Sequence, residues 1–121
     1  MADRSEHRAQ AELNRSLAER LLAEGRRDND QGLIDWAVTV AFYSAVHCVE
    51  AALADHGLHP KNHRERFDQM LAARIPEDVG LAYDILKDLS EQGRYERRNF
   101  DPDIVERTIL GHYLRRVLTL L

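Results

Sequence analysis

Residues 31–56 read QGLIDWAVTVAFYSAVHCVEAALADH, and this stretch decides the fold. Its apolar side chains lie nearly all round a helical repeat, which is typical of the central helix of a bundle. Residues 28–30 (DND) offer capping side chains before it, and Gly57 closes it. Its most apolar part, residues 36–54, approaches the length that crosses a membrane. Because it is rich in alanine and contains His47 and Glu50, we expect a buried helix in a soluble protein and no membrane span.

Further helices are expected on both sides of this stretch, from apolar spacing and from the positions of glycine and proline. They are predicted over residues 5–24, ending at Gly25, from 62, over 77–97 and from 101, where an aspartate precedes a proline. Their expected core positions are Leu13, Leu17, Leu21, Phe67, Met70, Leu71, Val79, Tyr83, Leu86, Leu89, Ile104, Ile109, Leu110, Tyr113, Val117 and Leu121. No stretch alternates as a strand does, so residues 1–121 are predicted to form one all-α domain, an up-and-down bundle of four to five helices.

Composition and charge exclude several classes of protein. Lys and Arg total 17 and Asp and Glu total 21, so the net charge of −4 argues against binding nucleic acid through an overall positive field. A single cysteine, Cys48, excludes an internal disulfide, and its mid-helix position indicates packing more than nucleophilic chemistry. The first residues lack the apolar segment of a signal peptide, so a cytoplasmic location is expected.

Two short segments concentrate positive charge in this acidic chain. Residues 59–66 read HPKNHRER and residues 93–99 read GRYERRN. Guanidinium groups bind phosphates through forked hydrogen bonds, and an interleaved tyrosine can stack on a base. If the two segments lie close together in the fold, they form a small basic patch large enough to bind RNA. The alternative is two solvated helix ends, where basic side chains also favour the helix dipole.

Other chemistry is less well supported. The sequence has no Gly-rich phosphate loop, no G-x-S-x-G and no H-E-x-x-H. Three histidines follow a spacing known from zinc sites, but Gly57 and Pro60 prevent them from sharing one helix face; they are His56, His59 and His63. We therefore predict no metal and no cofactor.

The helix over residues 31–56 also has a row of polar side chains. Tyr43, His47 and Glu50 are spaced at i, i+4 and i+7, so they share one face. On a buried helix such groups are hydrogen-bonded internally, and this is the favoured interpretation. A small-ligand pocket lined by Trp36, Tyr43 and His47 is an alternative.

Several of these stretches resemble one family. Residues 35–37 (DWA) with 41–47 (AFYSAVH) are similar to the second-helix signature of HEPN domains. Residues 57–64 (GLHPKNHR) resemble the loop of small stand-alone members, and residues 94–100 (RYERRNF) resemble the segment before their last helix. The resemblance covers about residues 30–121.

The resemblance implies a helical homodimer in which the last inter-helix segments of two chains form a shared cleft. Active members are metal-independent ribonucleases of toxin–antitoxin, CRISPR and other antiviral systems, and some are paired with a nucleotidyltransferase. Their signature is an arginine followed after four to six residues by a histidine. Arg94 matches the arginine, but Asn99 stands at the histidine position and cannot serve as an acid or base. His59 or His63 can replace it only if their loop folds over Arg94.

Two functions follow as hypotheses. The first is an RNA- or nucleotide-phosphate-binding cleft, with cleavage left open because the motif histidine is missing. The residues expected to bind nucleic acid are Arg94, Tyr95, Arg97, Arg98, Lys61, His63 and Arg64. The second is a non-catalytic interaction module that dimerises and binds a neighbouring enzyme.

Overall fold

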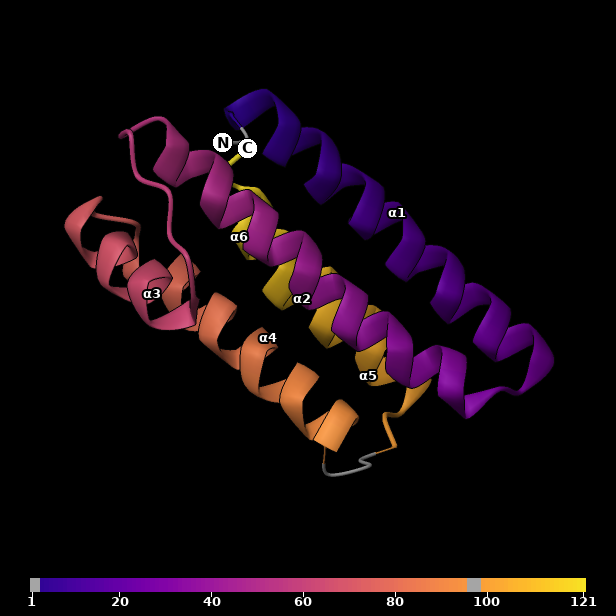
Figure 1. Ribbon diagram of the computed structural model, residues 1–121. Helices are drawn as coiled ribbons and strands as arrows, with labels where there is room; N and C mark the ends of the chain where they lie inside the picture. Colours follow the sequence, from indigo (N-terminus) through magenta and orange to yellow (C-terminus); the bar gives the residue numbers. More distant parts are fainter. Residues whose placement is uncertain (1–2, 96–98) are drawn as a thin grey trace.

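The computed structural model describes residues 3–95 and 99–121, and within these ranges the chain forms helices and no strand (Figure 1). The predicted all-α fold is confirmed. The helices are α1 (Arg4–Asp28), α2 (Gln31–Ala54), α3 (His63–Ala72) and α4 (Glu77–Tyr95), followed by α5 (Pro102–Ile104), η1 (Val105–Leu114) and α6 (Arg115–Leu118). The last three are consecutive and make up one C-terminal helix.

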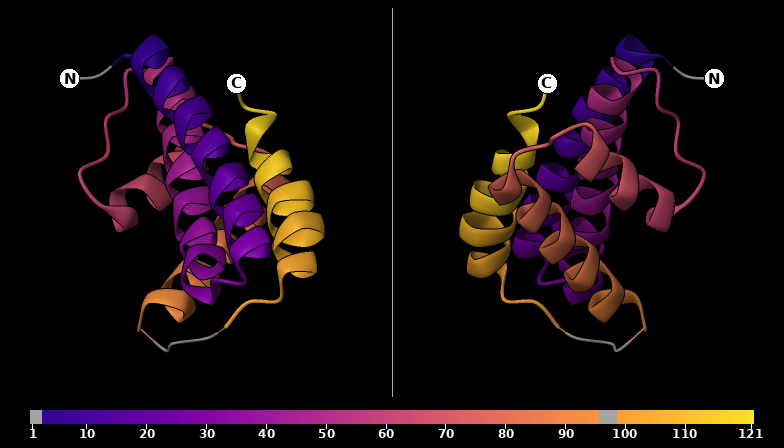
Figure 2. Two further views of the ribbon diagram at one scale, coloured as in Figure 1. Left: turned by 90° about the vertical axis from the view of Figure 1, so that its right-hand side faces the viewer. Right: turned by 90° about the vertical axis from the view of Figure 1, so that its left-hand side faces the viewer.

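Helix α2 is the centre of the bundle, as its sequence predicts. It packs against α1 and α4 on its two sides and against the C-terminal helix behind it (Figures 1 and 2). Its length and composition would suit a membrane span, but 67% of its apolar window is buried inside the bundle, as in the core helix of a soluble protein. Burial therefore accounts for its apolar character.

The end of α1 differs from the prediction. Gly25 does not stop the helix but lies inside it, fully packed against the start of α2, where a Cβ atom would come within 2.6 Å of Ile34. The glycine is needed for this close approach. The helix ends instead at Asn29, which adopts a left-handed conformation with φ of 52° and donates its N–H to carbonyls of the last turn. Leu13, expected in the core, is 65% exposed.

Helix α3 also buries a different face from the one expected. Phe67 and Leu71 are mainly exposed, whereas Met70 is buried together with Arg66. This short helix lies on the outside of the bundle and packs along one edge, against α2 and, through Arg66, against Tyr83 of α4. The Arg66 guanidinium forms hydrogen bonds along that edge, and these determine which face of α3 is buried. The spacing of apolar residues does not reveal them.

The C-terminal helix contains a π-helical segment that the sequence does not predict. Hydrogen bonds in such a segment join residues five apart, so the core-facing positions shift from the ordinary helical spacing. Ile104, just before this segment and expected in the core, is 48% exposed and Val105 is buried, whereas Ile109 and Val117 are buried as expected. Gly111 lies within this segment, where a Cβ atom would come within 2.8 Å of the Glu106 carbonyl oxygen.

Candidate nucleic-acid interface

The segment that follows α4 is anchored to the start of α2. One carboxylate oxygen of Asp35 accepts hydrogen bonds from the Phe100 backbone N–H at 2.8 Å and from the Gln31 side-chain amide at 2.7 Å. The same amide donates to the Phe100 carbonyl oxygen at 2.8 Å. Asp35 thus has a structural role, since it holds the chain next to the predicted cleft residues.

Phe100 completes this anchor from the other side. Its ring is buried, and a Cβ atom on Gly93 would come within 2.9 Å of the ring edge. The lack of a side chain at Gly93 therefore lets the ring pack directly on the last turns of α4. The preceding residue, Asn99, is exposed.

Arg94 lies in the last turn of α4 and its side chain is partly buried. Its Nε donates to the Ser90 carbonyl oxygen at 3.4 Å, one turn earlier. Tyr95 is the final residue of α4. The predictions for Arg97 and Arg98 fall outside the described residues, so they stay predictions.

The other basic segment forms the start of α3. Asn62 caps this helix by accepting the Glu65 N–H at 2.9 Å, and the Glu65 carboxylate accepts the Lys61 N–H at 2.8 Å. Lys61 and Arg64 are exposed at this end, where the sequence expects phosphate contacts. The predicted cap is therefore present, and it presents both cations to solvent.

His63 lies in the first turn of α3 and is exposed, but its ring lies beside Phe42 and Arg66. Its ring lies 5.7 Å from the Phe42 ring, centroid to centroid. Its Nδ1 accepts a hydrogen bond from Arg66 Nη1 at 2.8 Å, because a guanidinium can only donate. A neutral His63 therefore carries its proton on Nε2. This bond also makes Nδ1 unavailable as a metal ligand.

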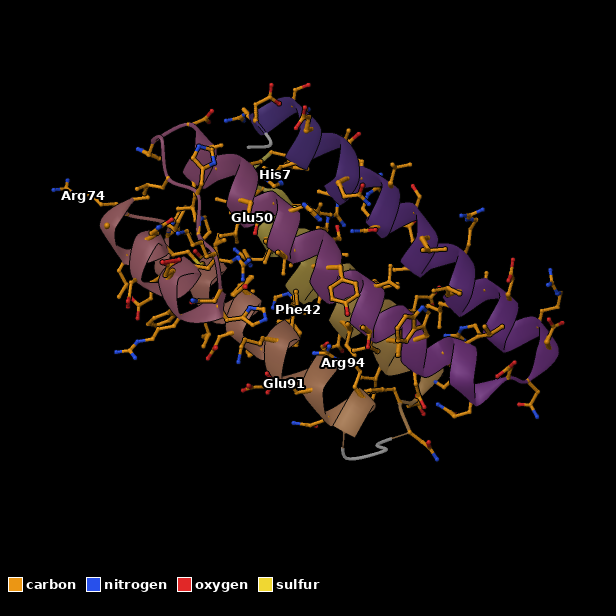
Figure 3. All side chains as sticks on the ribbon, viewed as in Figure 1. His7, Phe42, Glu50, Arg74, Glu91 and Arg94 are labelled. Atoms are coloured by element: carbon orange, nitrogen blue, oxygen red, sulfur yellow. The ribbon has the colours of Figure 1, made fainter. Side chains whose placement is uncertain are left out.

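The charges around His63 connect the two basic segments. Burial lowers the pKa of His63, and the positive charges of Arg66, Lys87 and Arg94 lower it further, while Glu91 opposes them. Arg94 from one segment therefore lies within electrostatic reach of His63 from the other. Figure 3 shows Arg94 and Glu91 of α4 on the same side of the bundle as Phe42 of α2.

Lys87 was not among the predicted residues. It lies two turns before Arg94 on α4, and its ammonium group pairs with Glu91 at 3.1 Å. The spacing of seven residues between Lys87 and Arg94 places both cations on one face of the helix. This spacing is the signal in the sequence that could have found Lys87.

Comparison with known proteins agrees with this architecture. Residues 10–120 match the HEPN domain family. The chain belongs to the HEPN family. The match covers nearly the whole chain and extends the resemblance seen over residues 30–121 into α1. HEPN membership points to a ribonuclease-like or nucleotide-related role. No curated protein matches the chain.

Arg66 is the buried centre of the polar contacts in this HEPN domain. Its Nη2 donates to Glu50 at 2.6 Å and its Nη1 to the Tyr83 hydroxyl at 3.4 Å, in addition to His63. The Glu50 carboxylate also lies 3.2 Å from His7. His47 Nδ1 lies 3.0 Å from His7 Nδ1, so Glu50 and His47 are bonded inside the protein as expected, whereas Tyr43, on the same helix face, is 38% exposed.

The remaining alternatives fit the structure less well. Burial raises the pKa of the Cys48 thiol to about 12, so it is a protonated packing group and not a nucleophile. Trp36 and Tyr43 are 47% and 38% exposed, so they do not enclose a ligand with His47. A cavity of about 600 Å³ lies elsewhere, between α1 and the C-terminal helix, lined in part by Leu22 and Leu114.

Proposed function

We propose that this HEPN domain binds RNA or nucleotide phosphate at the surface formed by the end of α4 and the start of α3. The observation that carries the proposal is that Lys87 and Arg94 share one face of α4, within electrostatic reach of His63 at the start of α3. Cations grouped in this way can contact one stretch of phosphate backbone. Exposed Lys61 and Arg64 extend the positive charge along α3.

Each group has a definite part in this proposal. Arg94 binds a phosphate through its guanidinium fork, and Lys87 adds a point charge beside it. The Nε2–H of His63 donates a hydrogen bond to a phosphate oxygen, because Nδ1 already accepts one from Arg66. Tyr95, Arg97 and Arg98 stay predictions from the sequence for binding the same nucleic acid.

The same arrangement assigns a role in cleavage. Asn99 cannot transfer a proton, so the ribonuclease chemistry of active HEPN members has to use another group here. We assign stabilisation of the phosphate charge to Arg94 and to the Nε2–H of His63, which donates a hydrogen bond; with Nδ1 bonded to Arg66, the neutral imidazole itself transfers no proton. Loss of Arg94 or of His63, and not of Asn99, is therefore expected to abolish any cleavage.

Binding is tested with a fluorescent single-stranded RNA and the Arg94→Ala variant. Loss of one charge-assisted contact is expected to weaken binding about 10- to 100-fold. The matched control is Arg20→Ala, an exposed arginine of α1 on the other side of α2 from α4. Equal affinities of native protein and Arg94→Ala would refute the proposed surface.

Cleavage is tested separately with a mixed RNA pool. We expect native protein to cut, Asn99→Ala to retain the activity, and both Arg94→Ala and His63→Gln to lose it. If none of the four proteins cuts while native protein still binds, the domain is a phosphate-binding module without ribonuclease activity. Activity retained in His63→Gln would refute the role of this imidazole.

A second candidate function is an interaction module. Trp36 and Tyr43 are large exposed side chains two turns apart on α2, so they share one face of the central helix. We propose that this face joins two copies of the chain in the cytoplasm, and that the dimer then binds a partner such as a nucleotidyltransferase. Light scattering on native protein and on a Trp36→Lys/Tyr43→Lys variant tests the dimer, which the double variant is expected to lose. A native monomer would contradict it.

A further inference from the structure

His7, His47 and Glu50 bring three metal-binding atoms together where α1 crosses α2. His7 lies near the start of α1, whereas His47 and Glu50 are one turn apart on α2. Figure 3 shows His7 and Glu50 at the same end of this helix pair. All three side chains are partly buried. Spacing along the chain does not reveal this set, because its members come from two helices.

The separations of the three atoms suit a tetrahedral ion. His7 Nδ1 lies 3.0 Å from His47 Nδ1 and 3.2 Å from Glu50 Oε2, and His47 Nδ1 lies 3.9 Å from the same oxygen. A zinc ion with bonds of about 2.0–2.1 Å places neighbouring ligand atoms about 3.3 Å apart. The three atoms thus form a triangle of nearly the required size, and only one edge has to shorten.

Neighbouring groups hold these side chains in position. Ser44 on α2 donates to the Ala11 carbonyl oxygen of α1 at 2.7 Å, one turn from the histidines, and this bond is fully buried. Arg66 binds the other carboxylate oxygen, Oε1 of Glu50, at 2.6 Å and leaves Oε2 directed toward the histidines. At metal sites, a hydrogen bond of this kind to a ligating carboxylate fixes its orientation toward the ion.

We propose that His7, His47 and Glu50 bind a divalent transition-metal ion, with Zn²⁺ as the best match to two imidazoles and one carboxylate. Three protein ligands leave a fourth position for water. The ion fastens the start of α1 to α2. The proposal does not depend on RNA binding, because none of the three residues belongs to the surface around Arg94.

The test is titration with Co²⁺, whose visible absorption reports tetrahedral coordination, followed by displacement with Zn²⁺. The protein is prepared without a histidine tag, and bound metal is first removed with a chelator. The variants are His7→Ala and His47→Ala, and the matched control is His112→Ala, an exposed histidine of η1. Thermal unfolding in chelator shows that each variant is folded.

We expect native protein and His112→Ala to bind one Co²⁺ per chain with the visible bands, and Zn²⁺ to abolish them. Both ligand variants are expected to bind at least tenfold more weakly. Zn²⁺ is expected to raise the melting temperature of native protein but not that of His7→Ala. Absence of the bands in native protein, or the same affinity in either ligand variant, would overturn the proposal.

Discussion

His63 is the residue where the two basic segments meet, and its pKa reports on their distance. Replacing Arg94 with alanine removes a positive charge that lowers this pKa, so we expect the pKa to rise. Arg20→Ala, on α1, is expected to leave it unchanged. The measurement is an NMR titration of the His63 ring protons. An unshifted titration in Arg94→Ala would mean that the two segments do not converge.

The same pKa makes stability depend on pH. Because folding lowers the pKa of His63 below its ordinary value of about 6.5, the unfolded chain takes up a proton more readily than the folded one. The contribution of His63 is present above that value and is lost as pH falls below it. Urea unfolding between pH 7 and pH 5 is expected to show a smaller loss of stability for His63→Gln than for native protein. Equal losses would contradict the shift.

Gly93 is a second residue whose role is testable. Its Cβ atom in Gly93→Ala would come within 2.9 Å of the Phe100 ring, so the ring has to move from its buried position. We expect the free energy of unfolding to fall by about 1–3 kcal/mol, the usual cost of overpacking. Urea denaturation measures it, with Gly80→Ala as the control, since its Cβ would only touch Met70 at 3.9 Å. Equal stability of the two variants would show that the contact is not tight.

The start of the C-terminal helix depends on one cap. The Asp101 carboxylate accepts the N–H groups of Asp103 and Ile104 at 2.8 and 3.3 Å. Asp101→Ala is expected to cost about 1 kcal/mol, whereas Asp101→Asn keeps most of the stability. Thermal unfolding compares the two, and an equal loss in both would argue against capping.

Local rules predicted the helices better than their contacts. The caps at Asn62 and Asp101 and the buried α2 follow from short-range chemistry, and the structure contains them. The predicted end of α1 was wrong, because Gly25 allows the close approach of α2 and does not stop the helix. No local rule predicts such a contact between helices. The prediction of which α3 face is buried was wrong, because Arg66 is buried by its hydrogen bonds to Glu50 and Tyr83, which are distant in sequence. In the C-terminal helix, apolar spacing predicted the buried Ile109 and Val117 but not the exposed Ile104 or the π-helical segment.

At the scale of the whole molecule, the site depends on how the chain returns on itself. Arg94 and the basic loop were identified from the sequence, but their proximity needed α3 to lie against α2 beside α4. The spacing of Lys87 to Arg94 on α4 could have predicted Lys87, whereas His7 was missed because its partners lie on another helix. The HEPN match accounts for the architecture, and the structure adds the hydrogen bond between Arg66 and His63.

The most direct test of the account is the salt dependence of RNA affinity. Each phosphate contact to a single strand adds about 0.7 to the slope of log affinity against log salt concentration. We predict a clear negative slope for native protein, a slope smaller by about 0.7 for Arg94→Ala, and the native slope for Arg20→Ala. Identical slopes for native protein and Arg94→Ala would contradict a phosphate contact at Arg94, and with it the proposed surface.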